Sequence, residues 1–143
     1  MMHTRPLDER DFLRHFLDGL HARQRALRGS RGDVWRPRTD VYETDSEIVI
    51  KMSVPGVNPH EIGIDCNGEV ITIYGVRRDP SHDAVRTYHQ MEIRNGYFER
   101  RIAIHKPFDP REARGAYRDG FLYLYVPKVA EVIHHVLSIR VSF

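Results

Sequence analysis

Apolar and polar residues alternate with a period of two from Pro37 almost to the C-terminus, and proline and glycine turns separate the alternating runs. Because successive side chains of a strand point to opposite faces, this alternation indicates strands that bury one face. Short runs of this kind, with no long helical run after residue 36, favour two antiparallel sheets packed face to face. We therefore expect an all-β fold, an immunoglobulin-like antiparallel β-sandwich, over residues 37–128.

The clearest runs predict one strand at residues 48–54 and two hairpins. Asparagine, aspartate and glycine tolerate the positive φ angles of tight hairpin turns, so their pairs are strong turn signals. The signals are Pro55-Gly56 after the strand, Asn67-Gly68 in the first hairpin and Asp119-Gly120 in the second.

A polar stretch interrupts the alternation after Arg77. Within this stretch, Tyr88 to Glu92 alternates and predicts a short strand that projects from a long loop. Asn95-Gly96 then opens another strand, on which Arg100 shares parity with Phe98 and Ile102. We expect Arg100 to lie on or beside a buried face, where it needs an acidic or carbonyl partner.

Residues 1–36 form a separate N-terminal arm with helical periodicity and a surplus of arginine. Asp8 is a candidate N-cap, and residues 27–36 read as a flexible linker rich in glycine and arginine. The apolar stripe of the predicted short helix is Phe12, Leu13, Phe16, Leu17 and Leu20.

Composition restricts the partners and the compartment. The 22 basic and 20 acidic residues give a net charge of +2, which argues against nucleic acid as a partner. Cys66 is the only cysteine, so no intramolecular disulfide forms, and a reducing compartment, the cytoplasm, is expected. The first residues carry no unbroken apolar run, so we expect neither a signal peptide nor a membrane span.

No motif predicts an enzyme, a cofactor or a metal site. His60-Glu61 begins like a zinc-protease motif, but Ile64 stands where the second histidine is required. His134 and His135 are adjacent and would point to opposite faces of a strand. Cys66 shares parity with Ile64, which indicates a buried and inert thiol.

Four motifs, in this order and spacing, resemble the α-crystallin domain of small heat-shock proteins of bacterial type, the Hsp20 family. The resemblance covers roughly residues 37–127, with a further match near the C-terminus. The motifs are Val54-Pro55-Gly56-Val57, Ile71-x-Ile73-x-Gly75-x-Arg77, Gly96-x-Phe98-x-Arg100 and the run from Ala116 through Asp119-Gly120 to Pro127-Lys128.

The resemblance implies a dimer made by strand exchange. The exchanged segment would include Tyr88, His89, Gln90, Met91 and Glu92, and it would pair with residues 39–43 of a second copy. Exchange covers a sheet edge that would otherwise template aggregation. The resemblance also places Arg100 at the dimer interface. The alternatives are that the segment folds back on its own chain and that Arg100 makes an ordinary surface ion pair.

The resemblance also implies that the C-terminal extension, residues 129–143, docks on a neighbouring dimer. Ile139 and Val141 match the family's I-x-I/V motif, and the receiving groove would lie between Ile62 and Ile64 on one strand and Tyr117 on another. The stretch before the motif is apolar where the family usually has a polar linker. A terminal strand packed on its own domain is the alternative.

The function that the resemblance implies is that of an ATP-independent holding chaperone of the stress response. Such a protein would bind partly unfolded client proteins and would work as dimers assembled into oligomers. The apolar stripe of the arm is the candidate client-binding surface, since mobile apolar side chains can cover exposed hydrophobic patches. The stripe could instead pack inside the oligomer. The alternative function is a non-chaperone adaptor that binds one defined partner.

Overall fold

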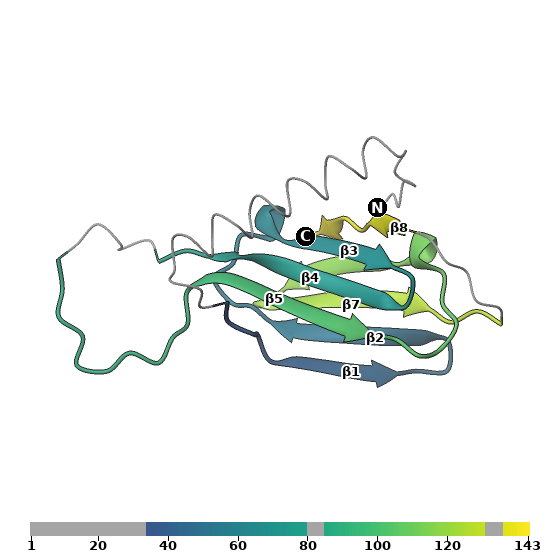
Figure 1. Cartoon of the computed structure of the whole chain (residues 1–143), viewed down its shortest axis with the longest axis horizontal. Coiled ribbons are helices and arrows are strands. Elements are labelled where there is room, and N and C mark those ends of the chain that lie inside the picture. Colours follow the sequence, from purple (N-terminus) through teal and green to yellow (C-terminus); the bar gives the residue numbers. More distant parts are fainter. Residues whose placement is uncertain (1–33, 80–84, 131–135) are drawn as a thin grey trace.

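The computed structural model describes residues 34–79, 85–130 and 136–143, and these form a sandwich of two β-sheets (Figure 1). The expected all-β sandwich is therefore confirmed. The predicted helix of the arm lies outside the described residues. Two short 3-10 helices, η1 (Pro59–Glu61) and η2 (Pro110–Glu112), connect strands.

The first sheet has five strands in the order β1-β2-β7-β6-β9. All neighbours are antiparallel except β6 and β9, which are parallel. The strands are β1 (Thr39–Glu43), β2 (Glu47–Ser53), β7 (Phe121–Pro127), β6 (Arg114–Arg118) and β9 (Val141–Ser142).

The second sheet has four antiparallel strands in the order β5-β4-β3-β8. These strands are β5 (Gly96–Ala103), β4 (Val70–Arg77), β3 (Gly63–Asn67) and β8 (Val136–Ser138). Because β8 and β9 both come from the C-terminal extension, the end of the chain joins one sheet and then the other.

The two predicted hairpins are present, but one turn differs by a residue. Asp119 and Gly120 both have positive φ, at 52° and 80°, as a type I′ turn requires. In the other hairpin Asn67 pairs with Val70, so the loop is Gly68-Glu69 and not Asn67-Gly68. Gly68 has a φ of 60° at the first loop position, where a type II′ turn needs glycine.

The core lies between the sheets and uses the parity expected from the sequence. Its side chains alternate along each strand and are almost completely buried. The largest contributions come from Ile50 and Met52 on β2, Ile71 and Ile73 on β4, Phe98 on β5, and Leu122 and Leu124 on β7.

The segment Tyr88 to Glu92 has no partner strand among the described residues of the single chain, so its pairing with a second copy stays a prediction. Residues 85–95 contain no strand in the structure. A strand needs a neighbour for its backbone hydrogen bonds, and this segment projects beyond the end of the sandwich, away from both sheets (Figure 1).

Candidate assembly site

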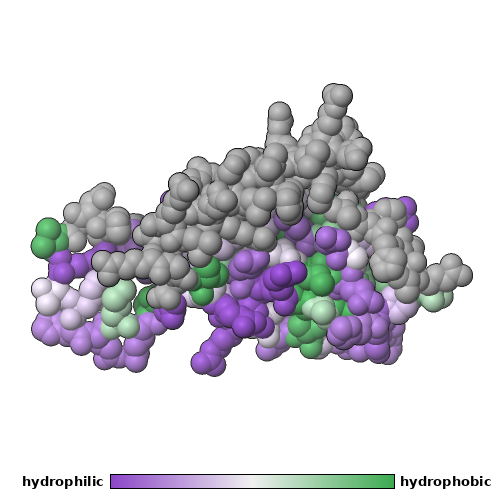
Figure 2. Space-filling view, viewed as in Figure 1, coloured by the Kyte–Doolittle hydropathy of each residue, from purple (hydrophilic) through white to green (hydrophobic). Residues whose placement is uncertain are grey.

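The segment 85–95, which we call the projecting loop, exposes apolar side chains. Val85 is fully exposed, and Met91 and Ile93 are about 70% exposed. Tyr88 is half exposed, and His89, Gln90 and Glu92 are exposed as well. Figure 2 shows hydrophobic surface among hydrophilic residues on this loop, at the left of the view. Apolar side chains held away from their own core are typical of an interaction surface.

Strand β1 provides an open edge on the body of the sandwich. Among the described residues it pairs with β2 alone and ends the five-stranded order. Val41 is 50% exposed and Tyr42 44% exposed, so its side chains are largely uncovered too. An edge strand of this kind is a template for a further strand unless something covers it.

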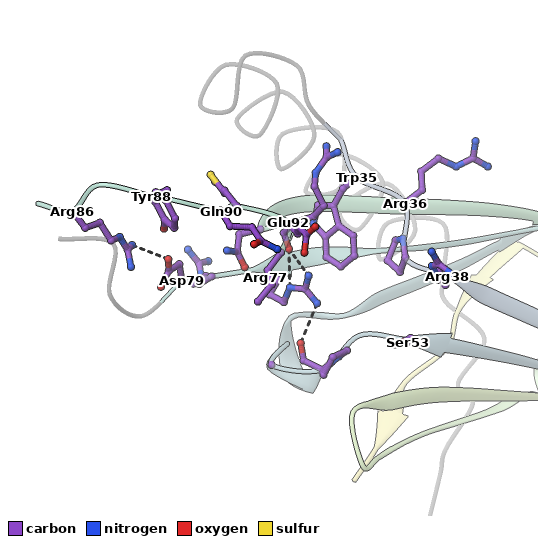
Figure 3. A pocket seen from close by; sticks show the side chains of 18 residues that line it. Trp35, Arg36, Arg38, Ser53, Arg77, Asp79, Arg86, Tyr88, Gln90 and Glu92 are labelled. Atoms are coloured by element: carbon purple, nitrogen blue, oxygen red, sulfur yellow. Dashed lines mark hydrogen bonds and ion pairs between the residues drawn. The ribbon is translucent and has the colours of Figure 1, made fainter. Parts of the chain in front are cut away.

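A cleft of about 1070 Å³ lies between the base of the projecting loop and the body of the domain (Figure 3). Its lining comes from the stretch Trp35–Arg38 before β1, from Ser53 and the turn at Pro55-Gly56, from residues 77–79 at the end of β4, and from most of the projecting loop. Arginine side chains dominate its charged lining, although Arg86 is paired with Asp79 at 2.7 Å. The cleft joins the projecting loop to the start of the open β1 edge.

Arg77 holds the base of this loop. Its Nε donates to the carbonyl oxygen of Arg94 at 2.9 Å, and its Nη2 donates to the same oxygen. Its Nη1 donates to the carbonyl oxygen of Pro55 at 3.3 Å. The guanidinium also lies 4.2 Å from the centre of the Trp35 ring. Burial lowers the pKa of Arg77, an effect that nearby Tyr117 partly opposes, and the group stays charged at neutral pH.

Arg100 lies on β5 opposite Ile73 of β4 and shares parity with the core residues Phe98 and Ile102. It is half-buried. Its Nε is buried and has no hydrogen-bond partner among the residues that the structure describes. An unmet donor on a cation is costly, so this nitrogen is a position where a partner group would stabilise the protein.

The C-terminal extension lies in a groove of its own domain. The backbone N–H of Ile139 donates to the carbonyl oxygen of Ile64 at 2.9 Å, and Val141 pairs with Gly115 of β6. Leu137 and Ile139 are 3% and 4% exposed, which makes them part of the core. In the structure, the described end of the extension therefore packs in cis, on its own domain. This is the alternative to docking on a neighbouring dimer.

The groove contains the residues expected to form it. Ile62 and Ile64 are buried on the β3 side, and Tyr117 packs against the core on the β6 side. The hydroxyl of Tyr117 donates to the carbonyl oxygen of Val54 at 3.0 Å. The ring of Phe143 meets that of His60 edge to face, with centroids 4.4 Å apart. The extension therefore contacts both walls of the groove.

Sequence reasoning missed three residues of these surfaces. Leu137 is buried in the groove, and its strand parity with Ile139 and Val141 could have indicated this from the sequence. Trp35 is 7% exposed and its ring centre lies 5.3 Å from that of Phe98. Arg77 was recognised only as part of a motif, because its contacts join residues distant in sequence.

The remaining candidates add little to these surfaces. The stripe Phe12, Leu13, Phe16, Leu17 and Leu20 lies outside the described residues. Burial raises the pKa of the Cys66 thiol to about 11, as expected for an inert cysteine.

Within residues 34–79, 85–130 and 136–143, no helix is long and apolar enough to span a membrane. The same residues contain no group of three or more potential metal ligands.

Comparison with known proteins gives one consistent result. The model of the Hsp20/alpha crystallin family matches residues 40–142. Small heat shock protein C2 of Rickettsia felis is 30% identical over 92 residues, which cover 64% of this chain and 60% of that protein. The chain thus spans less than two thirds of the length of this relative.

Two solved structures from bacteria share the fold. The small heat-shock protein of Xylella fastidiosa, described as having a distinct high order structure, is 27% identical with a TM-score of 0.62. The match covers 71% of this chain and 93% of that one. The hspA protein of Xanthomonas axonopodis is 29% identical with a TM-score of 0.62, covering 67% of this chain and 96% of that one.

Proposed function

The chain belongs to the Hsp20/alpha crystallin family, and on this premise we propose that it is an ATP-independent holding chaperone. It binds partly unfolded proteins, prevents their aggregation and catalyses no reaction. One observation carries the proposal: the same chain presents a projecting loop with uncovered apolar side chains and an open edge at β1. Neither surface is covered by the residues that the structure describes, so the geometry favours assembly.

The dimer forms when the projecting loop of each copy crosses to the other. Tyr88, His89, Gln90, Met91 and Glu92 become a strand beside β1 of the partner, which supplies the missing backbone partners. Two such exchanges related by two-fold symmetry cover both open edges and bury both loops. A carboxylate or carbonyl oxygen from the partner meets the Nε of Arg100, whose unmet donor supports its place at this interface.

Higher assembly uses the C-terminal extension. The contacts that Ile139 and Val141 make with their own groove are available unchanged between copies, because a domain swap exchanges identical elements. A neighbour's extension then occupies the groove of Ile62, Ile64 and Tyr117. This part of the proposal is supported by the burial of Ile139 in that groove. The single cysteine remains consistent with a cytoplasmic location.

Clients bind to the N-terminal arm through the stripe Phe12, Leu13, Phe16, Leu17 and Leu20. Burying one large apolar side chain is worth roughly 1.5–3 kcal/mol. Several arms carried by one oligomer multiply this affinity without a shaped pocket and without ATP. The charge balance of the chain gives no reason to expect nucleic acid as a client.

The test is suppression of aggregation of a heat-labile reporter enzyme, followed by light scattering without ATP. We expect the wild-type chain to suppress scattering at about equimolar subunit ratio and Phe16→Ser to lose most of this effect, because it removes one apolar contact from every arm. His15→Ser is the matched control, since it lies next to Phe16 but off the stripe. If the reporter enzyme scatters as much light with the wild-type chain as without it, the chaperone function is contradicted and the adaptor alternative is favoured.

A further inference from the structure

We propose that Arg77 is a positioning residue for dimerisation: it ties the return end of the projecting loop to the end of β4 and holds it against Trp35 and the Pro55-Gly56 turn. The inference rests on the exchange dimer proposed above and adds the residue that aims the loop. Figure 3 shows Arg77 between the loop base and the body of the domain, with its hydrogen bonds drawn to both.

The first step is the closure of the loop. Arg77 is the last residue of β4, and Arg94 stands two residues before the start of β5. Two N–H groups of one side chain donate to the Arg94 carbonyl oxygen, so a single residue ties the end of β4 to the return end of the projecting loop. The pairing of Arg77 with Gly96 continues the same closure in the sheet. Residues 85–93 then project from the sandwich beside this closure.

The second step is the anchor for this clasp. The Trp35 ring, 4.2 Å from the Arg77 guanidinium, is itself fixed by several contacts. Its indole N–H donates to the Gly96 carbonyl oxygen at 3.1 Å, and its backbone bonds with Tyr97 and Glu99 of β5. A cation held over the face of an indole ring is attracted by the ring's electron density. Arg77 therefore lies on a ring that is itself bonded to the start of β5.

The third step connects the clasp to the groove of the C-terminal extension. The Nη1 of Arg77 donates to the Pro55 carbonyl oxygen, and the Tyr117 hydroxyl donates to the adjacent Val54 carbonyl oxygen. One turn therefore receives a hydrogen bond from the loop base and another from the wall of the groove. Only arginine has enough donors in a fixed planar fork to make the loop and turn contacts together.

Preorganisation explains why the clasp matters for binding. A loop whose return end is fixed loses less conformational freedom when it pairs with a partner, and that saving appears as affinity. Removing the clasp should weaken the dimer even where the sandwich itself remains folded. If Arg77 merely stabilised the sandwich, its substitution would lower thermal stability and leave the dissociation constant of the dimer unchanged.

The experiment follows the release of monomers from the assembly by sedimentation of the full chain over a range of concentrations, which gives an apparent dissociation constant, with thermal unfolding as a parallel readout. We expect Arg77→Ala to raise the constant about tenfold, equivalent to about 1.4 kcal/mol. Arg78→Ala is the matched control, because Arg78 is the next residue, is exposed, and pairs only with Glu61 among the partners seen for it. We expect this control to stay within about twofold of wild type.

Two further measurements keep the outcomes distinct. Arg77→Lys keeps the charge but not the fork, so we expect intermediate weakening in a chain that folds. Trp35 is the only tryptophan, and its emission should shift to the red in Arg77→Ala as the stacked guanidinium is lost. Equal dissociation constants for wild type and both Arg77 variants would overturn the role of Arg77 alone. A wild-type chain that is monomeric at every concentration would overturn the exchange dimer and this inference with it.

Discussion

Gly75 of β4 lies directly against the ring of Phe98. A Cβ at this position would be 2.6 Å from Phe98 Cζ and 3.1 Å from the Glu61 carbonyl oxygen. Phe98 is completely buried and cannot move without disturbing the core around Ile73 and Trp35. The glycine is thus required by close packing.

We expect Gly75→Ala to lower the free energy of unfolding by about 1–3 kcal/mol, because overpacking forces the Phe98 ring from its site. Denaturant unfolding at constant protein concentration measures the change. Gly115→Ala is the control: its Cβ would meet its nearest atoms at 3.5 Å, which is ordinary contact. Equal stability of the two variants would show that the Phe98 site can relax.

At the scale of the element, the first sheet has a row of aromatic rings on its outer surface, formed by Phe121, Tyr123 and Tyr125 of β7. On the outer side of the first sheet, the Tyr123 and Tyr125 rings stack with centroids 6.1 Å apart. Lys51, Arg114 and Arg118 lie over rings of this row. The cations cover apolar rings while keeping their charge at the surface, which discourages stacking of this sheet on another.

The C-terminal extension is the element whose contacts are easiest to test. We expect Ile139→Ala to lower the free energy of unfolding by about 2–5 kcal/mol, since it removes a buried side chain from the groove. Arg140→Ala should have little effect, because Arg140 is exposed and lies between the two anchor residues. Chemical denaturation followed by circular dichroism measures both. An Ile139→Ala variant as stable as wild type would mean that the extension leaves the groove in solution.

At the scale of the whole molecule, the proposed contacts determine the size of the particle. The loop and β1 make dimers, and extensions exchanged between dimers link them into larger assemblies. We expect the full chain to be larger than a dimer by light scattering and a chain truncated after Lys128 to be a dimer. Circular dichroism must show that the truncated chain keeps its strands. A full chain no larger than a dimer would mean that the extensions stay in cis.

The sequence by itself determined the strands, their buried faces and the Asp119-Gly120 turn. These depend on a local period of two and on residues that tolerate positive φ, so neighbours along the chain were sufficient. The resemblance also identified the extension motif and its groove, since both depend on short patterns at particular places in the chain.

Only the tertiary structure decided the rest. The loop without a strand, the extension in its own groove and the contacts of Arg77 all depend on residues far apart in sequence. The Gly68-Glu69 turn depends on the register in which β3 and β4 pair when both bury their apolar faces. Ile139 has the same alternating pattern whether its groove belongs to its own chain or to another, because the two grooves are identical. Likewise, nothing in the residues around Arg77 indicates that Trp35, Pro55 and Arg94 meet at its guanidinium; the packing of two sheets brings them together.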